Sequence, residues 1–163
     1  MSLPIEFDPR TNVAMLGGES LVFHCHHYNC ALQRAIEEGL GGDAVDLLQR
    51  AGQEVAREQG AKLKGANSLG DAAQRFALLG FGRWDLAQIA NGRGTAVLHA
   101  SHYGLGWMSK YGERKTPACH FAAGYLAGSI AVASGLAAER VRVRETKCCA
   151  TGADVCSFEV EVL

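Results

Sequence analysis

The sequence predicts an α+β domain in which N-terminal helices pack with an antiparallel sheet and one long helix. Three observations lead to this fold class. Apolar residues recur at helical spacing between positions 18 and 79, apolar and polar residues alternate after position 82, and small residues fill the stretch from Pro117 to Ser134. With 163 residues the chain can bury a core of its own, so we expect a single domain over residues 1–163.

The composition argues against several classes of protein. Acidic and basic residues are dispersed and nearly balanced, with a formal net charge of −1, so nothing favours nucleic acid or an anionic membrane as a partner. No stretch is apolar enough to span a membrane and the N-terminus has no signal pattern, which predicts a cytoplasmic protein. In that compartment, metal ligation explains the six cysteines better than disulfides do.

The first half of the chain is predicted to be an arm followed by helices. Residues 1–16 should form an extended arm, irregular up to position 12 because prolines oppose regular structure there, with 14–16 as a short strand or a lead-in. Such an arm could wrap a partner subunit. Helices are predicted at about 18–40, 43–60 and 71–79, the first ended by a pair of glycines. The predicted inward stripe of the first helix is Leu21, Cys25, Tyr28, Leu32 and Ala35 or Ile36.

The second half begins with a predicted hairpin. Residues 83–90 and 95–100 have strand character and flank Asn91 and Gly92, a dipeptide typical of tight hairpin turns. Residues 101–112 are expected to be a short helix or a loop. The small side chains of the long helix that follows would allow very close packing against the sheet or another subunit.

The C-terminal hairpin should point an acid and a thiol toward the interior. Residues 140–145 alternate between charged and apolar, and Glu145 lies in phase with the inward-facing valines. In the next strand Cys156 is in phase with Phe158. A buried carboxylate is costly unless it finds a partner, and a metal cation would keep it ionised.

A metal ion would also explain the neighbouring thiols. Cys148 and Cys156 can supply thiolates, which suit zinc. Thr116 and Pro117 predict a helix start that places Cys119 in the first turn, where the helix dipole favours a thiolate. We therefore expect a closed, structural zinc site, with iron as a second candidate ion; its ligands are Cys119, Glu145, Cys148 and Cys156. The alternatives are ordinary buried thiols with Glu145 paired to an arginine, or Cys149 as ligand in place of Cys148.

These residues carry a resemblance. The run from Cys119 through Gly124 and Tyr125 to Gly128, followed by Glu145-x-x-Cys148 and Cys156, resembles the 4-vinyl reductase (4VR) domain family. That family includes phenol-sensing input domains of bacterial transcription activators, a protein linked to bacteriochlorophyll vinyl reduction and small hydrocarbon-binding proteins. The resemblance covers about position 99 to the C-terminus. It implies a fold related to haem-nitric-oxide-binding domains and Golgi transport-tether subunits, a zinc ion on the four residues above, and a preference for Cys148 over Cys149.

A second cluster of candidate ligands lies early in the chain. His24, His26, His27 and Cys30 fall within seven positions, and pairs of them are three or four residues apart on a helix, so they could hold a second metal ion or a haem iron. His99, His102 or His120 could complete such a site. The alternative is that the histidines are ordinary helix residues.

The sequence points to a binding module more than to an enzyme. We expect a homodimeric, metal-stabilised sensor of an apolar, aromatic or tetrapyrrole small molecule, which signals through another protein. The alternatives are a tetrapyrrole vinyl reductase or its accessory factor, for which no nicotinamide or flavin motif is visible, a metal or haem sensor, and a structural scaffold. The candidate pocket residues, types that more often belong to plain core, are Phe23, Tyr28, Phe76, Trp84, His99, Trp107 and Phe121.

Overall fold

The structure is a computed structural model that describes residues 5–16, 18–22, 24–62 and 69–163. Its helices are α1 (His26–Leu40), α2 (Ala44–Lys62), α3 (Leu69–Leu78), α4 (His102–Tyr111) and α5 (His120–Ser134). Its strands are β1 (Ile5–Asp8), β2 (Val13–Leu16), β3 (Glu19–Leu21), β4 (Arg83–Ala90), β5 (Arg93–His99), β6 (Val141–Lys147) and β7 (Cys156–Val162). The α+β fold class is therefore confirmed.

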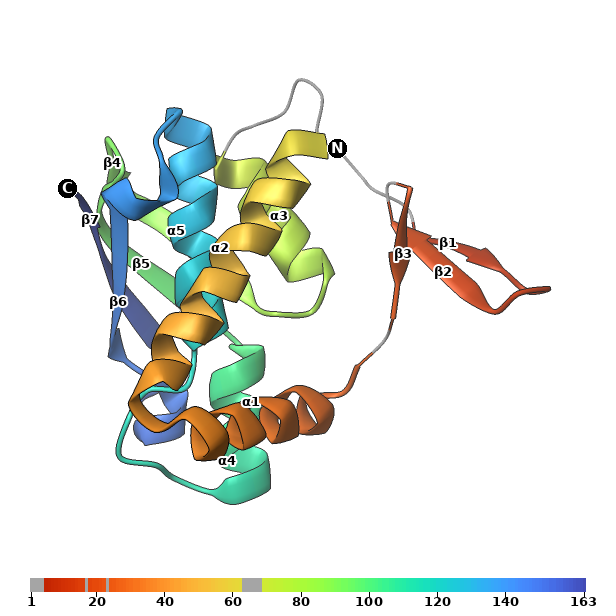
Figure 1. Cartoon of the computed structure of the whole chain (residues 1–163), viewed down its shortest axis with the longest axis horizontal. Coiled ribbons are helices and arrows are strands. Elements are labelled where there is room, and N and C mark those ends of the chain that lie inside the picture. Colours follow the sequence, from red (N-terminus) through yellow and green to blue (C-terminus); the bar gives the residue numbers. More distant parts are fainter. Residues whose placement is uncertain (1–4, 17, 23, 63–68) are drawn as a thin grey trace.

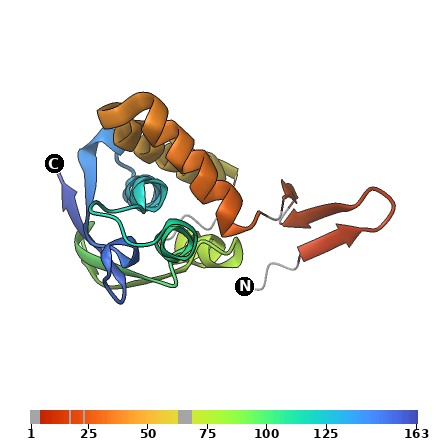
Figure 2. The same cartoon turned by 90° about the horizontal axis from the view of Figure 1, so that it is seen from below.

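The main sheet has four antiparallel strands in the order β4-β5-β7-β6. Helix α5 lies between this sheet and α2 (Figures 1 and 2). Eleven residues of α5 are buried, which explains why its sequence is apolar on all sides instead of along one stripe. Within the described residues, none of the helices combines the length and apolarity required to traverse a bilayer.

Glycines allow α2 and α5 to cross at very short range. A Cβ atom on Gly124 would lie 1.9 Å from the backbone oxygen of Gln49, and one on Gly52 would lie 2.2 Å from the backbone oxygen of Phe121. Both neighbours are backbone atoms, so any side chain at either position would push the helices apart. This crossing fixes α5, and with it the loop that enters α5 at Cys119.

The N-terminal arm is a correction to the sequence prediction. Residues 5–8, 13–16 and 19–21 form a three-stranded antiparallel sheet in the order β1-β2-β3, and this sheet projects away from the body of the molecule (Figure 1). The arm is therefore regular where an irregular chain was expected. Pro9 lies in the turn between β1 and β2, where its missing N–H is not needed by the ladder.

The first helix is a second correction. It begins at His26 instead of near position 18, and it buries Cys30 and Gln33. The residues predicted to face inward are largely outside: Cys25 is exposed, Tyr28 is 54% exposed and Leu32 is 52% exposed. The buried face is set by packing against α4, where a Cβ on Gly106 would lie 2.7 Å from the Cβ of His26 and 3.0 Å from the Cys30 sulfur.

The long helix starts three residues later than predicted. Cys119 is its N-cap, and the first backbone bond runs from the N–H of Ala123 to the carbonyl of Cys119. Thr116 and Pro117 belong to the preceding loop, and the Cys119 thiol makes no capping bond to the helix. The cysteine still lies at the N-terminal end of α5, facing the C-terminal hairpin.

Candidate metal centre

The strand pairing brings the acid and the thiols of the C-terminal hairpin to one place. Val143 pairs with Val160 and Glu145 with Phe158, so the alternation along β6 keeps Glu145 on the inner face. The register shifts just after Glu145, and the chain then turns through a short 3-10 helix, η3 (Cys149–Thr151). Cys156 opens β7 next to β5, and Cys119 reaches the same point from the start of α5.

Four side chains converge there. The donor atoms of Cys119, Glu145, Cys148 and Cys156 all lie within 4.8 Å of one another, and this is the one group of three or more His, Cys, Asp or Glu donors with that property among the described residues. The Cys119 sulfur is 3.8 Å from the Cys148 sulfur and 3.5 Å from the Cys156 sulfur. Each of the three cysteines is fully buried, and all six cysteines of the chain are free thiols.

Backbone and hydroxyl groups point at these sulfurs. The N–H of Ala118 lies 3.4 Å from the Cys148 sulfur, and the N–H of Cys149 lies 3.3 Å from the Cys156 sulfur. The Ser101 hydroxyl is 3.0 Å from the Cys119 sulfur. Donors of this kind orient metal-binding thiolates and stabilise their charge.

Glu145 has one satisfied and one unsatisfied oxygen. Its Oε2 accepts a hydrogen bond of 2.9 Å from the N–H of Cys119, whereas Oε1 is buried without a hydrogen-bond partner among the described residues. Burial, together with the neighbouring Cys148, raises the pKa of the Glu145 carboxyl to about 8. A buried acceptor without a partner costs about 1–3 kcal/mol, so this position calls for a cation or a proton.

The thiols show how little negative charge the site tolerates by itself. Burial raises the pKa of Cys119, and its hydrogen bonds to Cys148 and Cys156 raise it further. Hydrogen bonds from Cys119 and Cys156 lower the pKa of Cys148, which becomes the one thiolate of the group. A divalent cation would compensate the charge of several ionised ligands together, so the donor set fits a metal ion that binds sulfur and oxygen.

Cys149 does not take part in this group. Its thiol is buried and lies 3.6 Å from the carbonyl oxygen of Asp154. The sequence left Cys148 and Cys149 as alternatives, and the gathered group contains Cys148.

The early histidine cluster is only partly brought together. His24 is exposed and stacks on Tyr28, with ring centroids 4.4 Å apart, and Cys30 is buried next to the carbonyl of Tyr103. The rings of His26 and His27 lie close to each other, and His102 from α4 is near them. The two histidines that lie elsewhere are His99, at the end of β5, and His120, which is 3.6 Å from Glu37.

The candidate pocket residues lie in different parts of the structure. Phe76 and Trp84 belong to one buried aromatic cluster, and Phe121 packs nearby against Phe81. Trp107, on α4, lies beneath the Arg114 guanidinium at 4.1 Å. The remaining three are Tyr28 on the surface, His99 half-buried in β5, and Phe23, which lies outside the described residues.

The structure adds residues that the sequence did not single out. Glu37 accepts hydrogen bonds from Gln33 and Arg114, while Gln33 also donates to the carbonyl of Ala118, beside the metal-site cysteine. Burial acts to raise the pKa of Glu37, but hydrogen bonds from His120, Gln33 and Arg114 outweigh it and hold that pKa at about 2. No local sequence pattern reveals this network, because Gln33 and Ala118 are 85 positions apart.

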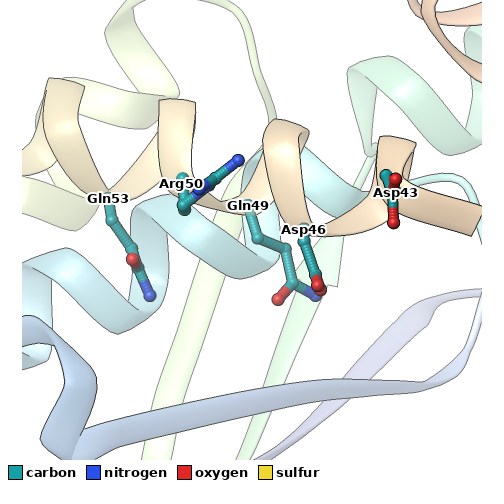
Figure 3. Close-up of a pocket in the computed structure, with 5 residues that line it drawn as sticks. All are labelled: Asp43, Asp46, Gln49, Arg50 and Gln53. Atoms are coloured by element: carbon teal, nitrogen blue, oxygen red, sulfur yellow. The ribbon is translucent and has the colours of Figure 1, made fainter. Parts of the chain in front are cut away.

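A polar hollow lies beside α2. It has a volume of about 370 Å³ and is lined by Asp43, Asp46, Gln49, Arg50 and Gln53 (Figure 3). Its lining side chains come from one helix and the turn before it, and they carry both signs of charge. It lacks the apolar walls that a site for an aromatic ligand needs.

The comparisons with known proteins agree with this geometry. Residues 107–162 match the family model of the 4VR (vinyl-4-reductase) domain. The resemblance to the 4-vinyl reductase family is confirmed. The matched stretch, which we call the 4VR region, contains all four donors of the metal centre, together with the end of α4, α5 and the C-terminal hairpin.

Two solved structures share the fold over most of the chain. The first is the phenol-responsive sensory domain of the transcription activator PoxR with phenol: TM-score 0.76, 19% identity, covering 97% of this chain and 84% of that one. The second is a vinyl-4-reductase family protein from Methanocaldococcus jannaschii: TM-score 0.61, 22% identity, covering 88% of this chain and 84% of that one. A search of curated proteins returned no similar sequence.

Proposed function

We propose that residues 1–163 act as one sensor module for an apolar or aromatic small molecule, and that a zinc ion on Cys119, Glu145, Cys148 and Cys156 holds the 4VR region together. The unpaired Oε1 of Glu145 supports the ion most directly, because a buried carboxylate oxygen is left free at the point where three sulfurs meet. Three thiolates bound to one zinc ion at about 2.3 Å lie about 3.8 Å apart. The sulfur separations of 3.5 and 3.8 Å are close to that spacing.

Four protein donors would leave no open position on the ion. We therefore assign the metal a structural role, in which it joins the start of α5 to the C-terminal hairpin. When bound, zinc would supply positive charge for the buried carboxylate and thiolates. The protein's own contribution is to hold those groups in place with backbone donors from Ala118, Cys119 and Cys149.

One observation supports a ligand site in the interior. Trp84 is 7% exposed, and its Nε1–H is buried without an acceptor in the described part of the chain. Around it, Phe76 and Phe158 have ring centroids 5.6 and 5.0 Å away, and Phe76 in turn contacts Tyr125 at 4.8 Å. A free donor among aromatic rings suits a ligand that combines an aromatic ring with a hydrogen-bond acceptor.

Arg75 adds a second donor near this cluster. It is 7% exposed, its Nε has no hydrogen-bond partner among the described residues, and its charge acts on the Tyr125 hydroxyl. PoxR's sensory domain is described as phenol-responsive, and the shared fold supports a ligand of similar size here. We therefore favour a single-ring aromatic ligand over a tetrapyrrole.

Tryptophan fluorescence gives a direct test. The chain has two tryptophans, so a Trp107→Phe variant leaves Trp84 as the only one to report on binding. Titration with phenol or p-cresol should change its emission saturably, and Trp84→Phe should weaken binding measured by calorimetry about tenfold, because about 1.4 kcal/mol of hydrogen bonding is lost. Trp107→Phe should bind as the unmodified protein does. Absence of saturable binding by simple aromatics, together with no co-purified molecule in native mass spectrometry, would reject the sensor.

Two further parts of this function stay predictions. The first is an output protein that reads the ligand state. The second is a homodimer, for which we propose the N-terminal sheet as the contact surface, because Ile5, Phe7 and Val22 expose 48, 59 and 71% of their surface on or next to it.

A further inference from the structure

Three histidines from two distant parts of the chain form a second group, which we name the histidine cluster: His26, His27 and His102. The rings of His26 and His27 are 4.3 Å apart between centroids, and those of His26 and His102 are 6.4 Å apart. His26 opens α1 and His102 opens α4. The close packing of α1 on Gly106 brings these two helix starts together.

His26 carries an unsatisfied group. Its Nε2 is buried and has no hydrogen-bond partner among the described residues, although the rest of the side chain is partly exposed. A buried polar atom of this kind normally has a partner, and its absence costs about 1–3 kcal/mol. An imidazole nitrogen without a proton donor or acceptor nearby is free to bind a metal ion.

His102 is held in position by Asn29. The Asn29 side-chain amide lies 2.9 Å from Nε2 of His102. When the amide presents its oxygen to the ring, that oxygen accepts from the Nε2–H, and the other ring nitrogen, Nδ1, keeps its lone pair. Metal-binding histidines usually have their second nitrogen tied to such an acceptor, which fixes the tautomer and the direction of the ring.

We propose that the histidine cluster is a second metal site, which takes a divalent transition-metal ion through His26 and His102, with His27 as the third ligand. Neutral imidazoles suit Zn²⁺, Ni²⁺ and Cu²⁺. Two imidazoles on one ion, with metal–nitrogen bonds of about 2.0–2.1 Å, have ring centroids about 5–6 Å apart. The observed 6.4 Å between His26 and His102 thus requires only a small side-chain movement.

The protonation of the cluster agrees with this role. Burial lowers the pKa of His102, and the neighbouring His26 lowers it further, so the ring is neutral and able to bind a metal near pH 7. Lys110 faces the same helix start and donates a 2.8 Å hydrogen bond to the carbonyl of His27. Its positive charge works against a cation. Together with the side-chain movement, this makes the site weaker and more readily exchanged than the cysteine centre.

The revised site differs from the one that the sequence suggests. His24 stacks on Tyr28 and Cys30 faces Tyr103, so neither belongs to the ligand set. The proposal does not depend on zinc at the cysteine centre or on the aromatic ligand. It can succeed or fail with the proposed sensor function intact.

Nickel provides the probe. Metal-loaded protein of residues 1–163 titrated with Ni²⁺ in a calorimeter should bind one further equivalent, without the thiolate-to-metal absorption band that replacement at the cysteine centre would give. His26→Ala and His102→Ala should each weaken this binding at least about tenfold, and Asn29→Leu should weaken it about 10–100-fold. His24→Ala is the matched control and should leave the affinity essentially unchanged, since His24 lies outside the cluster.

A spectroscopic measurement separates this site from casual binding by surface histidines. With one equivalent of Cu²⁺, electron paramagnetic resonance should show coupling to at least two imidazole nitrogens, and that pattern should disappear in His102→Ala while circular dichroism shows an unchanged fold. Absence of a further bound equivalent of Ni²⁺ would overturn the proposal. Equal losses in His24→Ala and His26→Ala would also overturn it.

Discussion

The cysteine centre and the histidine cluster differ in how their donors are held. At the cysteine centre, three fully buried sulfurs and one carboxylate lie within 4.8 Å of one another before any ion is considered. At the histidine cluster, the donors are on the more exposed starts of two helices and must rotate to share an ion. Both groups contain suitable ligands, so composition alone does not explain the difference.

The difference comes from the elements that carry the ligands. Strand pairing in β6 and β7 and the close crossing of α2 and α5 fix the backbone around the cysteine centre. Rigid elements place ligands in the productive geometry, and the fold compensates the cost of burying them. Helix starts at the surface leave side chains free, so ligand order there has to come from the ion itself. The following predictions test this comparison, from the largest expected effect to the smallest.

Loss of a cysteine ligand should have the largest effect. Cys156→Ser should lose the metal, measured by elemental analysis of the purified protein. It should also lower the melting temperature by about 10 °C or more, because a structural metal contributes several kcal/mol to folding. Cys149→Ala is the matched control, since that thiol is also buried but contacts Asp154. It should retain the metal and cost about 1 kcal/mol. A Cys156→Ser protein that keeps its metal would contradict the proposed site.

Removal of the metal should reverse the pH dependence of stability. Without an ion, Glu145 has a folded pKa of about 8 against an ordinary value of 4.5. The folded state then binds the extra proton, so the stability from this group is complete below pH 4.5 and is lost as the pH rises toward 8. With an ion bound, the ligands must be deprotonated, so stability should instead rise with pH over that range.

Urea denaturation of chelated and metal-loaded protein at about pH 5 and about pH 8 measures both slopes. Glu145→Gln cannot titrate, and it should flatten the slope of the chelated protein. If the chelated and loaded proteins show the same slope, Glu145 is not the group that the ion compensates.

The smallest effect concerns the link between the two groups of ligands. Helix α1 carries His26, and its Glu37 bonds to Gln33 and Arg114 near the cysteine centre. Glu37→Gln should destabilise the protein by about 2 kcal/mol, because a largely buried charge network is broken. Since the folded pKa of Glu37 is about 2 against an ordinary 4.5, its contribution is complete above pH 4.5 and is lost as the pH falls toward 2.

Glu38→Gln is the control for that measurement. Glu38 is the next residue, but it pairs with Arg34 on an exposed face, and its loss should cost about 0.3–0.5 kcal/mol. Urea denaturation near neutral pH compares the two variants. Equal effects would mean that α1 is not tied to the cysteine centre through Glu37.

The C-terminal part of the fold was predictable because its signals are local. Alternation in β6 and β7 placed Glu145 and Cys156 on one face, and the Asn91–Gly92 turn predicted the β4–β5 hairpin. The N-terminal part was predicted less well. The strands β1 and β3 were missed because they are very short and β1 runs into a proline turn, and the inward face of α1 was misplaced toward Tyr28.

The sequence by itself determined the α+β class, the C-terminal hairpin and the four residues of the proposed metal centre, because a period of two is exact and a one-residue error would turn every side chain to the wrong face. Only the tertiary structure decided which face of α1 is buried, that Cys149 stays outside the group of donors, and that His102 is the histidine that joins His26. Those choices depend on which distant element packs against each helix, and spacing along the chain does not contain that information.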